Sequence, residues 1–511
     1  MNPCTIIRQQ YLDRPPERTG AATRRGRALW AMAASALLVM ALAPPARADT
    51  HRDRPHIVMI VIDTLRADHL GCYGYDRDTS PRIDALAERG VRFDRCYSTS
   101  SWTLPAVASL LSGTYPTRHG ATTWTGRVRD DVPWLVALLQ DAGYHTMGVS
   151  SNPFLTSDHG FDRGFDTFDD ETVLAAAEWS FPLLESKHKA LVLASTSATA
   201  TRRAMQLLNE APDDQPLFLL VHYMDPHADY LPPSPPEGPE APEGSEPPAA
   251  RFDPDYEGSI TGHVQSENIS TDISERDLAH IKALYDGEIA HVDRYVGQLL
   301  DHLDAMKLRD QTAVVLTADH GEELLDHGGW FHGHTLYEEA VRVPLIVDWP
   351  GRGQRGRAVP EPVSLVDVMP TMLELLGEPT PAEVHGRSLA EAMAGEPLEA
   401  APLLMQTRLS GRLAAAVVGR DKVIAYTAGR GGDLVLDEKQ HFDLGADPAE
   451  RDAKPDDPQA AERMAELLIG LLRRYDASAA GAEPVEQADL ERQQLQRLRE
   501  LGYVGSEHHE P

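Results

Sequence analysis

Three continuous apolar runs, each leading directly into acidic or histidine residues, constrain the fold of this chain more than any other feature. They span residues 56–62, 216–222 and 313–318. A short unbroken apolar run is typical of a strand buried on both faces of a parallel sheet. Asp63 follows the first run and Asp319 follows the third. Because sites in open α/β sheets lie at the carboxyl ends of strands, we expect these acids to meet at one sheet edge.

Helical patterns separate the predicted strands and indicate an α/β fold. Apolar residues recur every three or four positions over 278–303, which predicts a helix with one buried face. A further strand at 343–347 and a helix at 367–376 complete a large domain over residues 54–380. Beyond it, residues 381–511 are predicted to form a smaller α+β domain. Its pattern consists of short strands over 402–444 and helices over 460–475 and 490–501.

Charge and cysteine content exclude several classes of protein. The 511 residues include 48 Lys and Arg against 79 Asp and Glu, a formal net charge of −31, which excludes nucleic-acid binding by bulk charge. The three cysteines, Cys4, Cys72 and Cys96, exclude a disulfide scaffold and an all-thiolate metal site. Cys72 and Cys96 either form one bridge or remain as two buried thiols.

The N-terminal segment has the organisation of a secretory signal peptide. Arg24, Arg25 and Arg27 precede the apolar run 28–43, and small residues at 46 and 48 mark a cleavage site. Residues 1–48 are therefore predicted to be removed, leaving a periplasmic or secreted protein without a transmembrane domain. The alternative is an uncleaved membrane anchor, although the run is shorter than the roughly 20 residues that span a bilayer. The Pro-rich segment 231–250 is expected to be an exposed loop.

Residues at the predicted strand ends suit a divalent metal ion. Asp63, Asp319 and His320 offer oxygen and imidazole ligands, which Mn, Zn, Ca and Mg accept to different degrees. A metal also activates a nearby hydroxyl group as a nucleophile. The hydroxyl-rich segment 98–103 precedes a predicted helix, where such residues act as N-caps and where a transferring anion is favoured. Taken alone, a hydroxyl segment of this kind is more often explained by capping, and a lone Asp–His pair by buried ion pairs. Found together in an α/β protein, they favour the catalytic interpretation.

Several motifs together resemble the sulfatase family of the alkaline phosphatase superfamily. The matching segments are residues 62–68, 110–120, 225–227, 317–322 and 337–344, with 442–450 similar to the family's C-terminal domain. The resemblance covers about residues 54–380 and makes this segment a sulfatase-like catalytic domain. It implies an alkaline-phosphatase-like mixed central sheet sandwiched by helices, followed by a small antiparallel sheet packed with a helix.

The chain departs from the family pattern where the sulfatase nucleophile normally lies. Family members carry Cys or Ser in a Cys/Ser-x-Pro-x-Arg motif, and this residue is oxidised to formylglycine. Here the window begins with Thr103 and ends with Val107, so the aldehyde precursor and the motif arginine are both missing. Thr64 replaces the second acid of the usual Asp-Asp pair, and the expected Lys and His are replaced around 151–153. Thr103 instead resembles the nucleophile of nucleotide pyrophosphatase/phosphodiesterases, phosphoethanolamine transferases and lipoteichoic acid synthases.

The resemblance implies a role for each candidate residue. Thr103 is expected to attack a phosphoester and form a covalent phosphothreonine beside a metal held by Asp63, Thr103, Asp319 and His320. His227 and His334 match positions that bind the transferring anion or protonate the leaving group. Asn152 is expected to donate to a substrate oxygen. His222 and His332 are candidates for substrate or second-metal contacts, or for a purely structural role.

Three functions therefore remain open at this stage. The first is a metal-dependent hydrolase or transferase acting on phosphate esters. The second is a sulfuric ester hydrolase that works without formylglycine, and the third is a non-catalytic binding protein that keeps the fold. The substrate is expected to be a small-molecule, lipid or glycan ester. Its identity depends on pocket walls for which the sequence shows no recognisable motif.

Overall fold

The computed structural model arranges the three predicted apolar runs as neighbouring strands of one sheet. β1 (His56–Ile62) lies between β5 (Leu217–Tyr223) and β6 (Thr312–Ala318) and pairs with both in parallel. All seven residues of β5 and of β6 are buried, as are six of the seven in β1. This two-sided burial explains why the segments are almost uniformly apolar. The three predicted strands are confirmed.

The structure describes residues 54–173, 196–232, 251–265, 268–409, 412–429, 434–453 and 457–478. The predicted signal peptide, most of the loop predicted at 231–250 and the helix predicted at 490–501 lie outside these residues. Among the helices of the described segments, none has both the length and the apolar character needed to span a bilayer.

The remaining strands make the sheet mixed. Its order is β10-β2-β9-β6-β1-β5-β3-β4, with β11 also paired to β2. β9 runs antiparallel to both β6 and β2, so β2 has the same direction as β6. The added strands are β2 (Val91–Tyr97), β3 (His145–Val149), β4 (Thr167–Asp169), β9 (Arg342–Asp348), β10 (Arg357–Val359) and β11 (Val363–Ser364). The expected mixed central sheet is therefore confirmed. Every strand of it except β9 runs in the same direction, so β1, β2, β3, β5 and β6 deliver their carboxyl ends to one edge.

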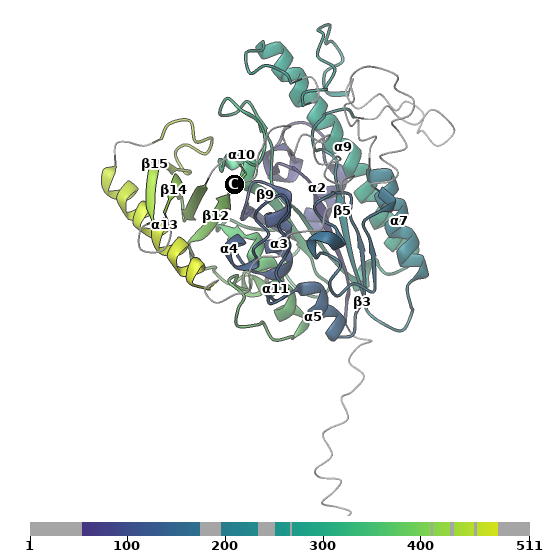
Figure 1. Ribbon diagram of the computed structural model, residues 1–511. Coiled ribbons are helices and arrows are strands. Elements are labelled where there is room, and N and C mark those ends of the chain that lie inside the picture. Colours follow the sequence, from purple (N-terminus) through teal and green to yellow (C-terminus); the bar gives the residue numbers. More distant parts are fainter. Residues whose placement is uncertain are drawn as a thin grey trace, which may run out of the picture. The chain divides into compact units, whose positions relative to one another are not determined.

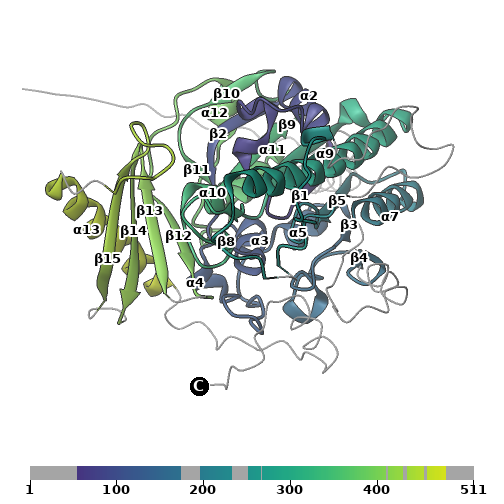
Figure 2. The same cartoon turned by 90° about the horizontal axis from the view of Figure 1, so that it is seen from above.

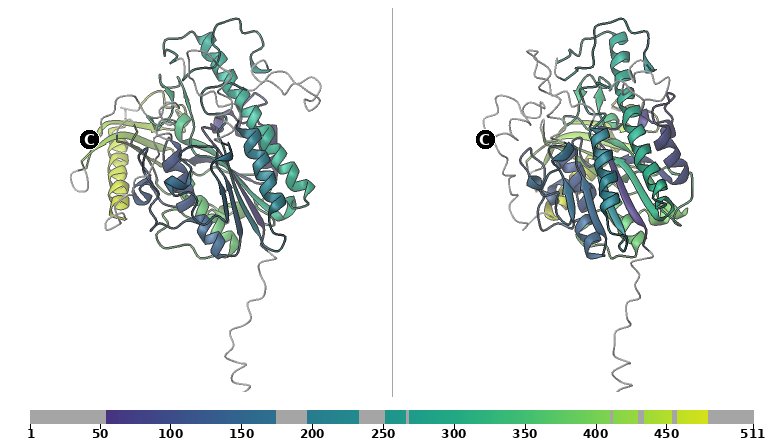
Figure 3. Two further views of the ribbon diagram at one scale, coloured as in Figure 1. Left: turned by 45° about the vertical axis from the view of Figure 1, so that its right-hand side comes forward. Right: turned by 90° about the vertical axis from the view of Figure 1, so that its right-hand side faces the viewer.

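Helices cover both faces of this sheet (Figures 1 and 3). On one face α7 packs against β5 and α9, and α2 packs against β9 and α9; on the other, α5 contacts β3 and α3, and α3 contacts α11. These helices are α2 (Pro81–Arg89), α3 (Thr103–Ser112), α5 (Leu135–Asp141), α7 (Ser197–Glu210), α9 (Glu275–Ala305) and α11 (Val368–Leu376). α9 extends the predicted helix by three residues at its start, where Ser274 accepts a capping hydrogen bond from the Asp277 amide.

Short elements connect the main ones. A two-stranded hairpin, β7 (Glu323–Leu324) and β8 (Trp330–Phe331), follows β6 and leads to His332. The short helices are α4 (Pro116–His119), α10 (Glu338–Val341), α12 (Ala390–Ala394), η2 (Ala67–His69), η3 (Gly71–Tyr73), η4 (Ser157–His159), η5 (Arg309–Gln311) and η6 (Leu365–Asp367).

A second, antiparallel sheet follows the large one. It consists of β12 (Leu403–Thr407), β13 (Leu413–Val418), β14 (Asp421–Ala428) and β15 (Val435–Asp443), in that order. α13 (Pro458–Ser478) packs on one face through Leu468 and Leu472 (Figure 2). The other face packs against Tyr97, Leu336 and Val341 of the large domain. The expected antiparallel sheet with a helix is confirmed, and the apolar clusters on its two faces both include residues of the large domain.

The two cysteines that the structure describes do not form a bridge. Cys72 is half-buried and Cys96 is buried, and both are free thiols. Of the two alternatives that the sequence left open, the disulfide is therefore wrong.

Candidate active site

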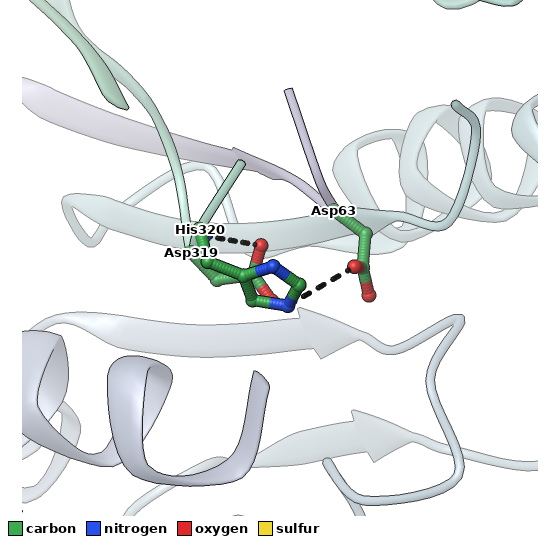
Figure 4. A group of neighbouring side chains, drawn as sticks. All are labelled: Asp63, Asp319 and His320. Atoms are coloured by element: carbon green, nitrogen blue, oxygen red, sulfur yellow. Dashed lines mark hydrogen bonds and ion pairs between the residues drawn. The ribbon is translucent and has the colours of Figure 1, made fainter. Parts of the chain in front are cut away.

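Two strand ends bring three potential metal ligands together. Asp63 follows β1, and Asp319 and His320 follow β6, its parallel neighbour. One donor atom from each of the three residues lies within 4.8 Å of the other two, and all three side chains are fully buried. Figure 4 shows the side chains turned toward one another from the two strand ends. The predicted convergence of acids at this edge is therefore present in the structure.

Unpaired oxygen atoms in this group suit a cation. Oδ1 of Asp63 and Oδ2 of Asp319 have no hydrogen-bond partner among the described residues. Nδ1 of His320 lies 2.9 Å from the Gly321 carbonyl oxygen and must donate to it, so Nε2 is left as an acceptor. Nε2 lies 3.6 Å from Oδ1 of Asp63 and 3.4 Å from Oδ2 of Asp319. Acceptor atoms of three buried groups thus face one another, an arrangement that a bound divalent cation would satisfy.

Electrostatics support the same interpretation. Burial raises the pKa of Asp63 well above its usual range, and the neighbouring Asp319 carboxylate raises it further. Burial also lowers the pKa of His320, which favours the neutral imidazole that a metal requires. A cation would offset the repulsion between the two carboxylates and so favour the charged form of Asp63.

Thr103 places its hydroxyl group against these residues. It is the first residue of α3, and its side chain is almost completely buried. Oγ1 lies 3.3 Å from Nε2 of His320 and 3.4 Å from Oδ2 of Asp63. α3 follows β2, whose carboxyl end faces the same edge as β1 and β6, which explains how a residue 40 positions after Asp63 reaches it.

The predicted capping role of the hydroxyl segment is wrong. An N-cap immediately precedes the first helical residue, and that position is held by Trp102, which makes no side-chain capping bond. Ser98 instead donates a 2.6 Å hydrogen bond to the carbonyl oxygen of Ser100. The helix begins one residue too late for Ser101 to cap it.

Asn152 joins the group from β3. Its Nδ2 donates to Oδ2 of Asp63 at 2.7 Å and lies 3.4 Å from Oγ1 of Thr103. Its Oδ1 accepts a 2.9 Å bond from the Phe154 amide, which fixes the orientation of the side-chain amide. Because a parallel strand delivers it, Asn152 lies at the same edge as the acids.

His222 lies beside the group within β5. Its Nε2 is 3.7 Å from Oδ2 of Asp63, and neither ring nitrogen is hydrogen-bonded to any part of the chain that the structure describes. Burial lowers its pKa to about 4, so the ring is neutral near pH 7. A buried imidazole with two unpaired nitrogens costs stability unless a ligand or water satisfies it.

Two further histidines extend the group away from Thr103. The ring of His332 lies 4.4 Å from that of His320 and 4.9 Å from that of His227, measured between centroids. Nδ1 of His332 lies 2.8 Å from Oε1 of Glu322, and Nδ1 of His227 lies 2.8 Å from the carbonyl oxygen of Ala228. Burial lowers the pKa of both histidines to about 4. Both rings are therefore neutral near pH 7.

His334 occupies a different position. Its Nε2 lies 2.9 Å from Oε2 of Glu323, and about a third of its side chain is exposed. The bond to Glu323 raises the pKa of His334, in contrast to the buried histidines. The predicted catalytic residues thus separate into Thr103 at the centre, His227 at the end of a row of rings, and His334 at the exposed border.

Three residues to which the sequence analysis gave no role in the site support it. Thr64 adopts a left-handed backbone with φ 53°, and its amide donates to Oδ1 of Asp319 at 3.2 Å. Tyr285 of α9 donates its hydroxyl to the Thr64 carbonyl at 2.7 Å. Glu322 bonds His332, and burial raises its pKa to about 7. Glu322 lies within the motif 317–322, so the sequence could have indicated its role. Tyr285 could not be recognised from the sequence, because no local pattern distinguishes one buried aromatic residue of a long helix from another.

Comparison with known proteins finds relatives over most of the chain. A family model described as Sulfatase matches residues 55–378. An N-acetylglucosamine-6-O-sulfatase of Bacteroides thetaiotaomicron is 25% identical over 426 residues, covering 71% of this chain and 74% of that protein. A choline-sulfatase of Rhizobium meliloti is 26% identical over 454 residues, covering 81% of this chain and 85% of the relative.

Solved structures share the fold. A phosphonate monoester hydrolase from Silicibacter pomeroyi superposes with a TM-score of 0.63 at 22% identity, over 83% of this chain and 96% of the other. This similarity extends beyond the matched family region and includes most of both chains. At this level of identity it establishes the architecture.

Proposed function

The chain belongs to the sulfatase family and is a sulfatase-like ester hydrolase, and we propose that it cleaves phosphate esters with Thr103 as the nucleophile. One observation carries the proposal. Oγ1 of Thr103 lies within 3.4 Å of Nε2 of His320, Oδ2 of Asp63 and Nδ2 of Asn152. A single buried hydroxyl thus faces two proton acceptors and one donor, which is the environment that a nucleophile requires.

The residues of the chain account for the first half of the reaction. Oγ1 of Thr103 would form a bond to phosphorus while the bond from phosphorus to the leaving oxygen breaks. Oδ2 of Asp63, 3.4 Å from Oγ1, can accept the hydroxyl proton, because Oδ1 is left for the cation and Nε2 of His320 would be a metal ligand. Asn152 would donate to a non-bridging oxygen, where charge increases in the transition state.

The second half releases the phosphoryl group from Thr103. A water molecule or an acceptor alcohol attacks phosphorus, the bond to Oγ1 breaks, and Oγ1 takes back the proton that Asp63 accepted in the first half. Because His227 and His332 are neutral near pH 7, each is suited to accept the proton of the attacking molecule. The exposed His334, whose pKa is raised, is better suited to contact the substrate anion at the mouth of the site.

The metal has a defined place in this proposal. Asp63, Asp319 and His320 would hold a divalent cation, with Thr103 adjacent. Such a cation, when bound, lowers the pKa of a neighbouring hydroxyl and neutralises charge on the transferring group. The unpaired carboxylate oxygens argue against the third interpretation, a non-catalytic binding protein, because burying them without a ligand is costly.

Sulfate ester hydrolysis without formylglycine is the second candidate. The two relatives named above are sulfatases by name, which favours it. Threonine at position 103 favours phosphate instead, since it is not the Cys or Ser from which formylglycine is made. The substrate would be a small-molecule, lipid or glycan ester, and the predicted signal peptide would place the enzyme in the periplasm or outside the cell.

A paired assay tests the proposal. Release of nitrophenol is measured from bis-nitrophenyl phosphate and from nitrophenyl sulfate, with Mn, Zn, Mg or Ca added, for the protein and for Thr103→Ala and Thr103→Ser. We expect metal-dependent cleavage of the phosphodiester, a loss of at least about a thousandfold in Thr103→Ala, and partial activity in Thr103→Ser. Mass spectrometry of acid-quenched protein should show phosphate on Thr103. Turnover of sulfate alone would refute the proposal.

A further inference from the structure

A cavity lies between the segment around α4 and the antiparallel sheet. Its volume is about 360 Å³, within the range of small-molecule pockets. Its walls come from three parts of the chain: residues 116–129, the strands β12 to β14 with Leu434 beyond them, and α13. The lining contains neither Thr103 nor the three candidate metal ligands, so this cavity is separate from the active site described above.

Positively charged side chains line the cavity, although the protein as a whole is acidic. Three arginines line it, Arg129, Arg408 and Arg412, against one carboxylate, Asp476. The whole chain carries a formal charge of −31, so three guanidinium groups at one cavity depart from the general balance. Guanidinium groups bind carboxylate, sulfate and phosphate through paired hydrogen bonds, which gives geometric selectivity as well as attraction.

The backbone holds two of these arginines in place. The amide of Arg129 donates to the carbonyl oxygen of His119 at 3.0 Å, and its own carbonyl accepts from Nη1 of Arg163 at 3.1 Å. The carbonyl of Arg412 accepts from the amide of Thr427 at 2.7 Å and from its hydroxyl at 3.1 Å. The backbone is therefore held at both residues, and Nη1 of Arg412 also donates to the Gly429 carbonyl at 3.5 Å, beside the cavity.

The rest of the lining combines hydroxyl groups with apolar surface. The polar neutral residues are Thr117, Thr122, Gln406, Thr407 and Thr427, and the larger apolar ones are Leu413, Leu434 and Leu472. A sugar ring presents hydroxyl groups at its edge and C–H groups on its faces, so this mixture is complementary to it. We propose that the cavity binds a saccharide unit that carries one anionic group, with the arginines contacting the anion.

The cavity is attached to the active-site segments through β12. The hydroxyl of Thr407 donates to the carbonyl of Gly333 at 2.8 Å, between His332 and His334. The amide of Gln406 donates to the carbonyl of Thr99 at 2.8 Å, four residues before Thr103. The wall of the cavity is thus bonded to both segments. This inference does not depend on whether the site cleaves phosphate or sulfate.

Binding measurements on a catalytically silent background test the inference. Isothermal titration of the Thr103→Ala protein with glucuronate, glucose 6-sulfate, glucose 6-phosphate and glucose compares three anionic sugars with a neutral one. We expect saturable binding of at least one anionic sugar and at least about tenfold weaker binding of glucose. Arg412→Gln and Arg408→Gln should each weaken the anionic sugar at least about tenfold, the loss expected for one charged hydrogen-bonding pair.

Matched variants keep the result interpretable. Arg420→Gln removes an exposed arginine of the same domain that is not part of the lining, and should leave binding unchanged. Arg412→Lys keeps the charge without the planar fork and should bind between the wild type and Arg412→Gln. If Arg412→Gln does not fold, Arg408→Gln provides the same test. Absence of binding by all three anionic sugars, or equal binding in both glutamine variants and the parent, would overturn the inference.

Discussion

The side-chain amide of Asn152 donates a 2.7 Å hydrogen bond to Oδ2 of Asp63. The bond occupies one carboxylate oxygen and leaves Oδ1 as the one without a hydrogen-bond partner among the described residues. Oδ1 faces Nε2 of His320 at 3.6 Å. Asn152 therefore orients the carboxylate in addition to lying near the Thr103 hydroxyl, and these two roles can be separated experimentally.

Replacing Asn152 should reduce turnover more than it reduces metal binding. In Asn152→Ala we expect kcat to fall by about 10² to 10³, the range for loss of one donor to developing charge, with a smaller change in KM. Steady-state kinetics with the nitrophenyl substrate measure this. Asn209→Ala, which alters an exposed asparagine of α7, is the control and should retain activity. A change confined to KM would argue against a transition-state role.

Removing the charge of Asp319 should weaken metal binding without unfolding the protein. Asp319→Asn keeps an oxygen that can accept from the His320 amide, as Oδ1 does at 2.8 Å, but loses the negative charge. We expect metal affinity to fall at least about tenfold, because hard cations prefer charged oxygen ligands. Equilibrium dialysis with elemental analysis gives the stoichiometry. Asp310→Asn, at an exposed position, should match the wild type, and equal affinity in Asp319→Asn would exclude Asp319 as a ligand.

The hydroxyl of Tyr285 should matter for both stability and catalysis. It donates to the Thr64 carbonyl at 2.7 Å and accepts from the Arg66 amide at 3.0 Å, and all three residues are buried. Tyr285→Phe leaves both groups unpaired, at a cost of about 1–3 kcal/mol in unfolding free energy. Because Thr64 adjoins Asp63 and bonds Asp319, kcat should fall while KM changes little.

A matched tyrosine variant separates this effect from a general one. Tyr256→Phe removes a hydroxyl that donates to Asp277 at 2.6 Å and accepts from the Ile260 amide at 3.1 Å. Both contacts are only part-buried, so water can replace the hydroxyl and the loss should cost less than about 1 kcal/mol. Urea unfolding followed by circular dichroism measures both variants. If Tyr285→Phe lowered stability and left kcat intact, Tyr285 would have a structural role alone.

Asp293 should make stability depend on pH. It lies buried in α9 and accepts hydrogen bonds from the amides of Arg82 and Ile83, yet burial raises its pKa to about 7. A carboxyl group with a raised folded-state pKa binds its proton more tightly in the folded protein. Its contribution to stability is complete below the unfolded-state pKa near 4 and is lost as the pH rises through about 7.

The measurement compares unfolding free energies of the wild type and Asp293→Asn between pH 4 and 8. The wild type should lose stability relative to Asp293→Asn as the pH rises, by at most about 1.4 kcal/mol per pH unit for one proton. Taking the difference removes contributions from other titrating groups, and the site lies outside the catalytic centre. A difference that stays constant with pH would show that Asp293 is ionised throughout this range.

The predicted strands and acids agree with the structure for a simple physical reason. A strand buried on both faces must be apolar along its whole length, so β1, β5 and β6 were recognisable from local composition. Parallel strands end at one edge, so the residues that follow them, Asp63 and Asp319, had to be neighbours.

Local pattern was insufficient where a contact depends on the path of a loop or on the first residue of a helix. His334 follows the β7–β8 hairpin, and its bond to Glu323 holds it at the exposed border. The hydroxyl segment does not cap α3, because the helix begins at Thr103 and Trp102 holds the N-cap position. A local pattern defines the first residue of a helix only to within one or two positions.

The sequence by itself determined the α/β fold, the edge at which the polar residues collect and the threonine that replaces the usual nucleophile. The tertiary structure alone decided which atoms meet there. Asn152 and Asp63 are 89 positions apart, Tyr285 and Thr64 are 221 apart, and Thr64 and Asp319 are 255 apart. Periodicity is set by the few residues of one strand or helix turn, whereas these bonds depend on the packing of whole elements against one another, which no local pattern encodes.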